Sequence, residues 1–154
     1  MKQHLFKTSD TFTGFILRFI LGLVFIPHGL QKTFGLFGGM GFTDTVHLFT
    51  GKMELPWGIA VAVILTEFLG SLCFLIGFAT RFWAVAFTGL MLGIMFTTHI
   101  ENGFFMNWFG TQKGEGCQFD LLVIGISVAL FIEGSGRSSV DRLITRKFQK
   151  NKEK

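Results

Sequence analysis

The chain has 154 residues, of which 49% are hydrophobic and 16% charged, with a mean hydropathy of +0.52 and a formal net charge of +4. A soluble domain of this length carries more charge and interrupts its apolar runs more often, so the composition excludes an ordinary water-soluble protein. The apolar residues form four blocks separated by glycine-, proline- or charge-containing connections. We therefore interpret the chain as an integral membrane protein.

The first apolar block predicts a membrane-spanning helix over about residues 12–33. It lacks a short apolar core followed by a small-residue cleavage site, so we expect a retained helix rather than a signal peptide. Arg18, His28, Gln31 and Lys32 nevertheless lie within this block or at its end. Polar side chains in hydrocarbon are unfavourable by several kcal/mol unless they are paired or reach water, so their partners must be sought elsewhere in the chain.

Three further spans are predicted at about residues 57–79, 82–100 and 119–134. The glycine-rich segment 35–56 has apolar residues at near-helical spacing, which predicts a short helix lying at the membrane surface. The fourth span is the shortest and needs a turn from the preceding loop, or local thinning of the bilayer, to cross. The sequence thus predicts an all-α, integral membrane four-helix bundle that forms one domain over residues 1–154.

Basic residues gather on one side of the predicted membrane. Lys2, Lys7, Arg81 and a basic tail at 137–154 all fall there. The positive-inside rule then places both termini in the cytoplasm and the protein in the plasma (inner) membrane. A basic tail beside a membrane helix binds anionic lipid headgroups far more often than nucleic acid, so the expected partner is the lipid bilayer and no nucleic acid.

The polar residues of the first span share one face. Each residue of an α-helix advances about 100°, so Arg18, His28 and Lys32 fall within an arc of about 80°. Glu67 lies near the middle of the second span, the least favourable depth for a lone carboxylate. Antiparallel packing of the two spans predicts a buried ion pair between Arg18 and Glu67, which is either purely structural or part of a site.

His28 and His99 have similar predicted depths in the outer half of the bundle. With Gln31, Glu67 and several Phe rings they are candidates to line one cavity, binding a ligand or relaying protons. Such a cavity suits a quinone head group or a small redox-active thiol compound. Ordinary hydrogen-bonded histidines are the alternative interpretation.

Lys32 and Glu115 are lesser candidates. Lys32 is most simply a membrane anchor whose ammonium group reaches the surface. The histidines have no HxxH or HxxxH spacing and the two cysteines, Cys73 and Cys117, have no CxxC spacing, so no metal site is predicted.

The sequence resembles the DoxX family of small membrane proteins over nearly its whole length. The similarity rests on Arg18-x₃-Gly22-x₂-Phe25-x₂-His28-Gly29-x-Gln31-Lys32-x-Phe34-Gly35, Gly38-Gly39-x-Gly41, Glu67-x₂-Gly70, Gly77-x₃-Arg81, Met91, His99, Gly114-Glu115-Gly116 and Gly134-x-Gly136-Arg137-x-Ser139-x-Asp141. Gln118 departs from the family, whose members often have a second acidic residue at that position.

The resemblance implies a four-helix membrane bundle. Family members have been linked to quinone-reactive assemblies, including a subunit of an archaeal thiosulfate:quinone oxidoreductase. The chain itself has no haem-binding pattern, dinucleotide-binding motif or iron–sulfur cysteine set. A quinone is therefore the expected ligand, with no cofactor held by the chain alone.

Three functional hypotheses follow. The leading one is a quinone-associated or thiol-redox-associated membrane subunit, either enzymatic or not, that works with other redox subunits or as a homo-oligomer. The first rival is a non-catalytic scaffold or assembly subunit whose polar core is structural. The second rival is a small transporter or proton pathway, because intramembrane Arg, Glu and His also serve that role.

Overall fold

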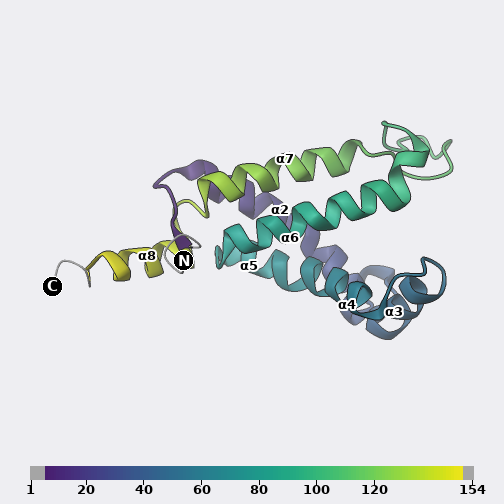
Figure 1. Ribbon diagram of the computed structural model, residues 1–154, viewed down its shortest axis with the longest axis horizontal. Helices are drawn as coiled ribbons and strands as arrows, with labels where there is room; N and C mark the ends of the chain where they lie inside the picture. Colours follow the sequence, from purple (N-terminus) through teal and green to yellow (C-terminus); the bar gives the residue numbers. More distant parts are fainter. Residues whose placement is uncertain (1–5, 151–154) are drawn as a thin grey trace.

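A computed structural model describes residues 6–150, and over that range the protein is all-helical with no strand (Figure 1). The helices are α2 (Phe12–Phe34), α3 (Gly41–Gly51), α4 (Trp57–Leu65), α5 (Ser71–Ile76), α6 (Thr80–Ile94), α7 (Gln118–Glu133) and α8 (Val140–Lys150). The shorter turns are η1 (Leu36–Gly38), the π-helical turns η2 (Thr66–Gly70) and η3 (Met95–His99), and η4 (Ile100–Asn102).

Three helical segments are long and apolar enough to cross a membrane: Phe12–Phe34, Trp57–Ile76 and Thr80–Asn102. They coincide with the first three predicted spans to within three residues at either end. The fourth predicted span corresponds to α7, a helix of 16 residues. The short helix predicted between the first two spans is α3.

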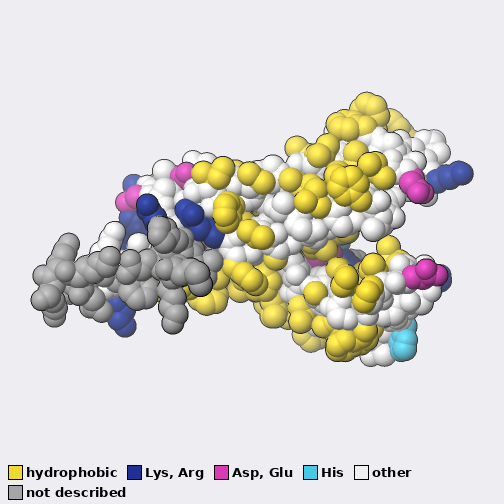
Figure 2. Space-filling model, in the orientation of Figure 1, with side chains coloured by type: hydrophobic (Ala, Val, Ile, Leu, Met, Phe, Trp, Pro, Cys, Tyr) yellow, Lys and Arg dark blue, Asp and Glu magenta, His cyan; other side chains and the backbone are white. Residues whose placement is uncertain are grey.

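The core lies where α2, α5, α6 and α7 meet. The ring of Phe87 from α6 stands edge-on to Phe25 of α2, with 4.9 Å between ring centroids, and lies 5.0 Å from Phe74 of α5. The other core side chains are Leu21, Ala84, Leu90, Met91, Val123 and Leu130. Large apolar residues also cover much of the outside (Figure 2), as a surface that faces lipid requires.

Glycines set the distance between α2 and its neighbours. A Cβ on Gly22 would lie 2.9 Å from the carbonyl oxygen of Ser71, and one on Gly29 would lie 2.6 Å from the Cα of Phe68. Small residues at such positions allow helices in a membrane to pack backbone against backbone. The two glycines therefore hold α2 directly against η2 and α5.

The helices are tied together more tightly at one end than at the other (Figure 1). At the tighter end, α8 and the beginning of α2 lie together, and Asp141 of α8 accepts hydrogen bonds from the backbone N–H groups of Ala79 (2.7 Å) and Thr80 (3.0 Å). At the other end, α4 and α3 diverge from α6. The predicted tail thus includes an ordered helix, while Lys2, Lys152 and Lys154 of the predicted charge pattern lie outside the described residues.

Candidate functional site

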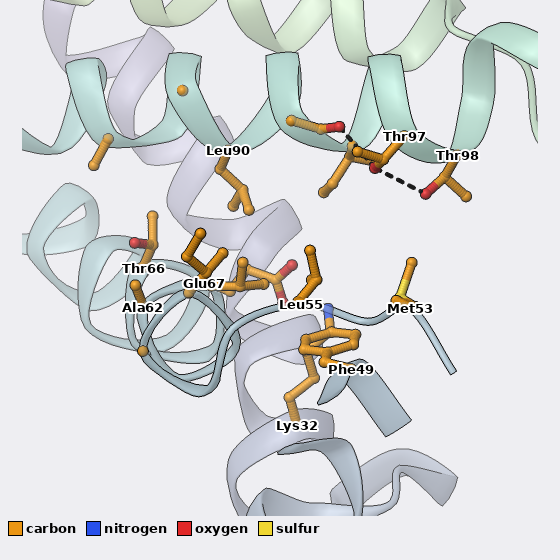
Figure 3. A pocket seen from close by; sticks show the side chains of 17 residues that line it. Lys32, Phe49, Met53, Leu55, Ala62, Thr66, Glu67, Leu90, Thr97 and Thr98 are labelled. Carbon is orange, nitrogen blue, oxygen red and sulfur yellow. Dashed lines mark hydrogen bonds and ion pairs between the residues drawn. The ribbon is translucent and has the colours of Figure 1, made fainter. Parts of the chain in front are cut away.

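A cavity of about 550 Å³ opens between α4 and α6 at the end where these helices diverge (Figure 3). Its walls come from α4 and η2, from α6 and η3, and from α3 with its connection to α4, and α2 contributes Lys32. The lining residues are Lys32, Phe49, Met53, Leu55, Gly58, Ile59, Ala62, Val63, Thr66, Glu67, Ala86, Gly89, Leu90, Gly93, Ile94, Thr97 and Thr98. Most of this surface is apolar, and its polar groups belong to one ion pair and three threonines.

The polar end of the cavity is an ion pair between Lys32 and Glu67. The Glu67 side chain is 4% exposed and that of Lys32 is 25% exposed, so the ammonium group is the more accessible partner. Figure 3 shows Lys32 extending from α2 toward Glu67, with Thr97 and Thr98 on the facing helix. In Figure 2 the recess is visible between two lobes of the surface, with acidic and basic atoms in its depth.

Gly29 explains why Lys32 reaches this depth. The backbone of α2 touches the π-helical turn η2 at Gly29, next to Phe68 and Glu67. Residues three apart lie on the same face of a helix, so Lys32 is presented to the same turn. Lys32, which the sequence suggests as a membrane anchor, pairs with Glu67 in the structure.

Both helical segments that face the cavity contain a π-helical turn. Glu67 belongs to η2 and His99 belongs to η3. Turns of this kind are rare within helices and occur frequently at functional sites, where the extra residue redirects side chains. Here η2 contributes Thr66 and Glu67 to the cavity wall, and η3 contributes Thr97 and Thr98.

The predicted ion pair between Arg18 and Glu67 is wrong. Arg18 is fully buried, and its guanidinium group donates five hydrogen bonds to backbone carbonyl oxygens. The acceptors are Phe74 (2.7 Å) and Leu75 (2.7 Å) of α5, and Ser135 (2.9 Å), Arg137 (3.3 Å) and Ser138 (2.7 Å) of the connection between α7 and α8. Carbonyl groups at the end of a helix carry partial negative charge, which stabilises the guanidinium group.

A second polar pair joins η3 to α7. His99 Nδ1 is 2.8 Å from Asp120 Oδ2, and Asp120, in the first turn of α7, is 1% exposed. The other carboxylate oxygen of Asp120 is buried without a partner among the described residues. The sequence offers one signal for this residue, because Asp120 is the one acidic residue in the fourth predicted span before Glu133.

The remaining candidates lie outside the cavity wall. His28 is exposed, and its ring is 5.9 Å from that of Phe25. Gln31 Nε2 donates a hydrogen bond to the carbonyl oxygen of Phe37 (3.2 Å), and Glu115 accepts one from the backbone N–H of Asn107 (2.8 Å). Of the four residues expected to share one cavity, His28, Gln31, Glu67 and His99, only Glu67 lines the cavity between α4 and α6.

Comparison with known proteins gives the family. A family model described as DoxX matches residues 14–100, more than half of the chain. The chain belongs to the DoxX family. The matched segment contains all the residues that line the cavity, but not Asp120.

Two relatives are similar to this DoxX-family chain over most of its length. The protein named "Putative oxidoreductase CatD" from Bacillus subtilis (strain 168) is 29% identical over 129 residues, which cover 84% of each chain. "Inner membrane protein YqjF" from Escherichia coli (strain K12) is 29% identical over 133 residues, covering 86% of this chain and 92% of the relative. No solved structure matches the DoxX-family protein described here.

Proposed function

We propose that this DoxX-family protein is a plasma-membrane subunit that binds a quinone in the cavity between α4 and α6. The observation that carries the proposal is the combination of an apolar cavity of about 550 Å³ with the Lys32–Glu67 pair at its polar end. Sites for small ligands are typically clefts of about 300–1,000 Å³ with apolar walls and a few placed polar groups. An apolar lining favours a quinone over a charged thiol compound.

The chemistry of the pair suits a quinone head group. The Lys32 ammonium group has hydrogens beyond the one it gives to Glu67, and it would donate one to a quinone carbonyl oxygen. Reduction of a quinone to a quinol takes up two electrons and two protons. Glu67 would hold the Lys32 ammonium group beside the ring, where it would give one proton. The second proton would come from water, and a partner redox subunit would supply the electrons.

The histidines take a different place in this proposal from the one that the sequence predicts. Thr98 lines the cavity and His99 follows it, paired with Asp120. We assign the ligand contact to Lys32 and keep proton relay by His99 as a prediction. The same holds for relay by His28, which packs against Phe25 at the edge of the core.

The proposal includes four spans with both termini in the cytoplasm. Its support is that α7 packs along α6 and that α8 lies at the same end of the molecule as the beginning of α2. The name of the Escherichia coli relative includes the inner membrane, and that of the Bacillus subtilis relative includes an oxidoreductase. Both names agree with a redox-associated plasma-membrane protein.

Quinone binding by purified variants tests this function. A short-chain ubiquinone analogue should raise the melting temperature of the wild type in detergent. Lys32→Met should weaken its affinity about tenfold or more, because a hydrogen bond from a charged donor contributes about 1.5–3 kcal/mol. Lys52→Met is the matched control, since Lys52 is exposed and does not line the cavity. Equal affinities in the wild type and Lys32→Met would contradict the assignment.

A structural role is the second candidate, and the geometry of Arg18 favours it. That side chain shows that a buried charge in this fold can serve only to join backbone segments. The Lys32–Glu67 pair would similarly join α2 to η2 in a non-catalytic scaffold. Under this alternative, Glu67→Gln lowers the melting temperature, and the quinone analogue changes the melting temperature of neither the wild type nor the variant.

A further inference from the structure

A second cavity, of about 590 Å³, lies at the beginning of α8 and is lined by three arginines. Arg137, Arg142 and Arg146 contribute to its wall, with Asp10 as the one carboxylate. Figure 2 shows basic side chains gathered at this end of the molecule. The cavity is separate from the one that we assign to a quinone, and its ligand does not depend on that assignment.

The level of this cavity relative to the membrane follows from Arg137. Its guanidinium carbon lies 4.8 Å from the centroid of the Phe12 ring. Phe12 is the first residue of α2, a span long enough to cross the bilayer, and it is 58% exposed. The arginines therefore stand where the span leaves the hydrocarbon, which is the level of the lipid headgroups.

Asp10 shows that the arginines are placed to hold an oxyanion. Its carboxylate accepts a hydrogen bond from Arg137 Nε (2.7 Å) and another from Arg142. Two guanidinium groups bind this one carboxylate and a third lines the same cavity, so the cavity keeps an excess of positive charge. Arg146 lines the same cavity and has no hydrogen bond to any other described residue, which leaves its guanidinium group available to a ligand.

An apolar residue completes the wall. Leu143 is 66% exposed and lines the cavity beside the arginines. A free inorganic anion has no apolar group to contact such a side chain, whereas the glycerol and upper acyl chain of a phospholipid lie at this depth. Arginine is suited to a phosphate group because its planar guanidinium binds two oxygens at once.

We propose that this cavity binds the headgroup of an anionic phospholipid. Arg146 and Arg142 contact the phosphodiester, and Leu143 contacts the beginning of an acyl chain. The bound lipid bridges α8 to the beginning of α2, and Asp10 already links the same two segments. Anionic lipid thereby helps to dock the C-terminal helix against the membrane-spanning part.

Two neighbouring residues of α8 give a charge-matched test. Arg146→Gln and Lys147→Gln each remove one positive charge from an exposed position of the same helix, but only Arg146 lines the cavity. Affinity of the full chain for phosphatidylglycerol, measured by native mass spectrometry of lipid-bound species, should fall about fivefold in Arg146→Gln. It should change less than twofold in Lys147→Gln. Arg146→Lys keeps the charge and should give an intermediate affinity.

The outcomes distinguish a specific phospholipid site from nonspecific electrostatic attraction between α8 and anionic lipid. Equal losses in Arg146→Gln and Lys147→Gln would overturn the proposal, because they would show diffuse electrostatics. Phosphatidylcholine, whose choline cation opposes the arginines, should bind more weakly than phosphatidylglycerol, and equal retention of both lipids would also overturn it. Inorganic phosphate at the same concentration should leave phosphatidylglycerol bound. Displacement by phosphate would show a free-anion site instead.

Discussion

Arg18 stabilises the fold through backbone carbonyl groups, which gives a sharp prediction for its replacement. Arg18→Met keeps much of the side-chain length but leaves five carbonyl oxygens without their donor, and the contacts to Phe74 and Ser135 are buried. We expect a loss of at least about 3 kcal/mol in the free energy of unfolding, because each unsatisfied buried group costs about 1–3 kcal/mol. Equilibrium unfolding of the purified protein in detergent measures the loss.

A double-mutant cycle then separates the observed contacts from the pair that the sequence predicts. Arg18 and Glu67 have different partners, so the effects of Arg18→Met and Glu67→Gln should add to within about 0.5 kcal/mol. A coupling energy above about 1 kcal/mol would contradict the contacts described for Arg18.

The sequence alone does not show which cation pairs with Glu67 or which groups bind Arg18. Helical periodicity places Arg18 and Lys32 on one face of the first span, and both are cationic, so either is a reasonable partner for a carboxylate at mid-depth. The decision depends on the relative height of two helices, which the contact at Gly29 sets. The partners of Arg18 are harder to predict, because they are backbone carbonyl groups. Every residue has one, and the sequence does not show which of them lack a hydrogen bond within a helix.

Asp10 makes the docking of α8 depend on pH. Hydrogen bonds from Arg142 and then Arg137 lower the pKa of Asp10 from its ordinary value of 3.8 to about 2. A carboxylate with a lowered pKa in the folded state contributes stability above pH 3.8, and this contribution is lost as the pH falls toward 2. The contribution is small because Asp10 is exposed.

Comparison with Asp10→Asn tests this dependence. The wild type should have the higher melting temperature at pH 7, and the difference should vanish as the pH approaches 2. A difference that stays constant between pH 7 and pH 2 would show that ionisation of Asp10 does not matter to the fold.

At the scale of elements, the contact between α2 and η2 should be the most sensitive to added volume. A Cβ on Gly29 would meet the backbone of Phe68, so Gly29→Ala should push the two elements apart. We expect a loss of about 1–3 kcal/mol in the free energy of unfolding, as for other overpacked contacts, together with weaker quinone binding because Lys32 moves away from Glu67.

Gly125 of α7 is the matched control for this change, because a Cβ there meets nothing within 4 Å. Gly125→Ala should be neutral or slightly stabilising, since alanine favours a helix over glycine by about 1 kcal/mol. A Gly29→Ala protein with wild-type stability and quinone affinity would show that the close contact is not needed.

The spans themselves were predictable, and the turns within them were not. Long apolar runs with few charges are enough to place the first three membrane helices. The π-helical turns at η2 and η3 leave no composition signal, because one extra residue in a helix changes neither hydropathy nor length noticeably. The sequence predicts only a basic tail where α8 forms, because the ordering of this helix depends on Asp141, Asp10 and the backbone of the turn before α6.

At the scale of the whole molecule, the cavity arises because α4 and α6 diverge and because glycines on both helices place no side chain in the space between them. Gly58, Gly89 and Gly93 line the cavity, and a Cβ on any of them would meet nothing within 4 Å. The sequence contains these glycines but does not say which of its many glycines face open space and which hold helices together. Polar residues inside the membrane correctly predict a polar interior, whereas the shape of the cavity needs the relative positions of three elements.

Filling this cavity is the most direct test of quinone binding. Gly93→Leu places a side chain into the open space on α6, while Gly125→Leu places the same side chain on the outside of α7. Both variants should fold, because neither site has a neighbour for the new Cβ to strike. In nanodiscs, the short-chain ubiquinone analogue should bind the wild type and Gly125→Leu with equal affinity and Gly93→Leu at least tenfold more weakly. Equal affinity in all three proteins would contradict a quinone site between α4 and α6.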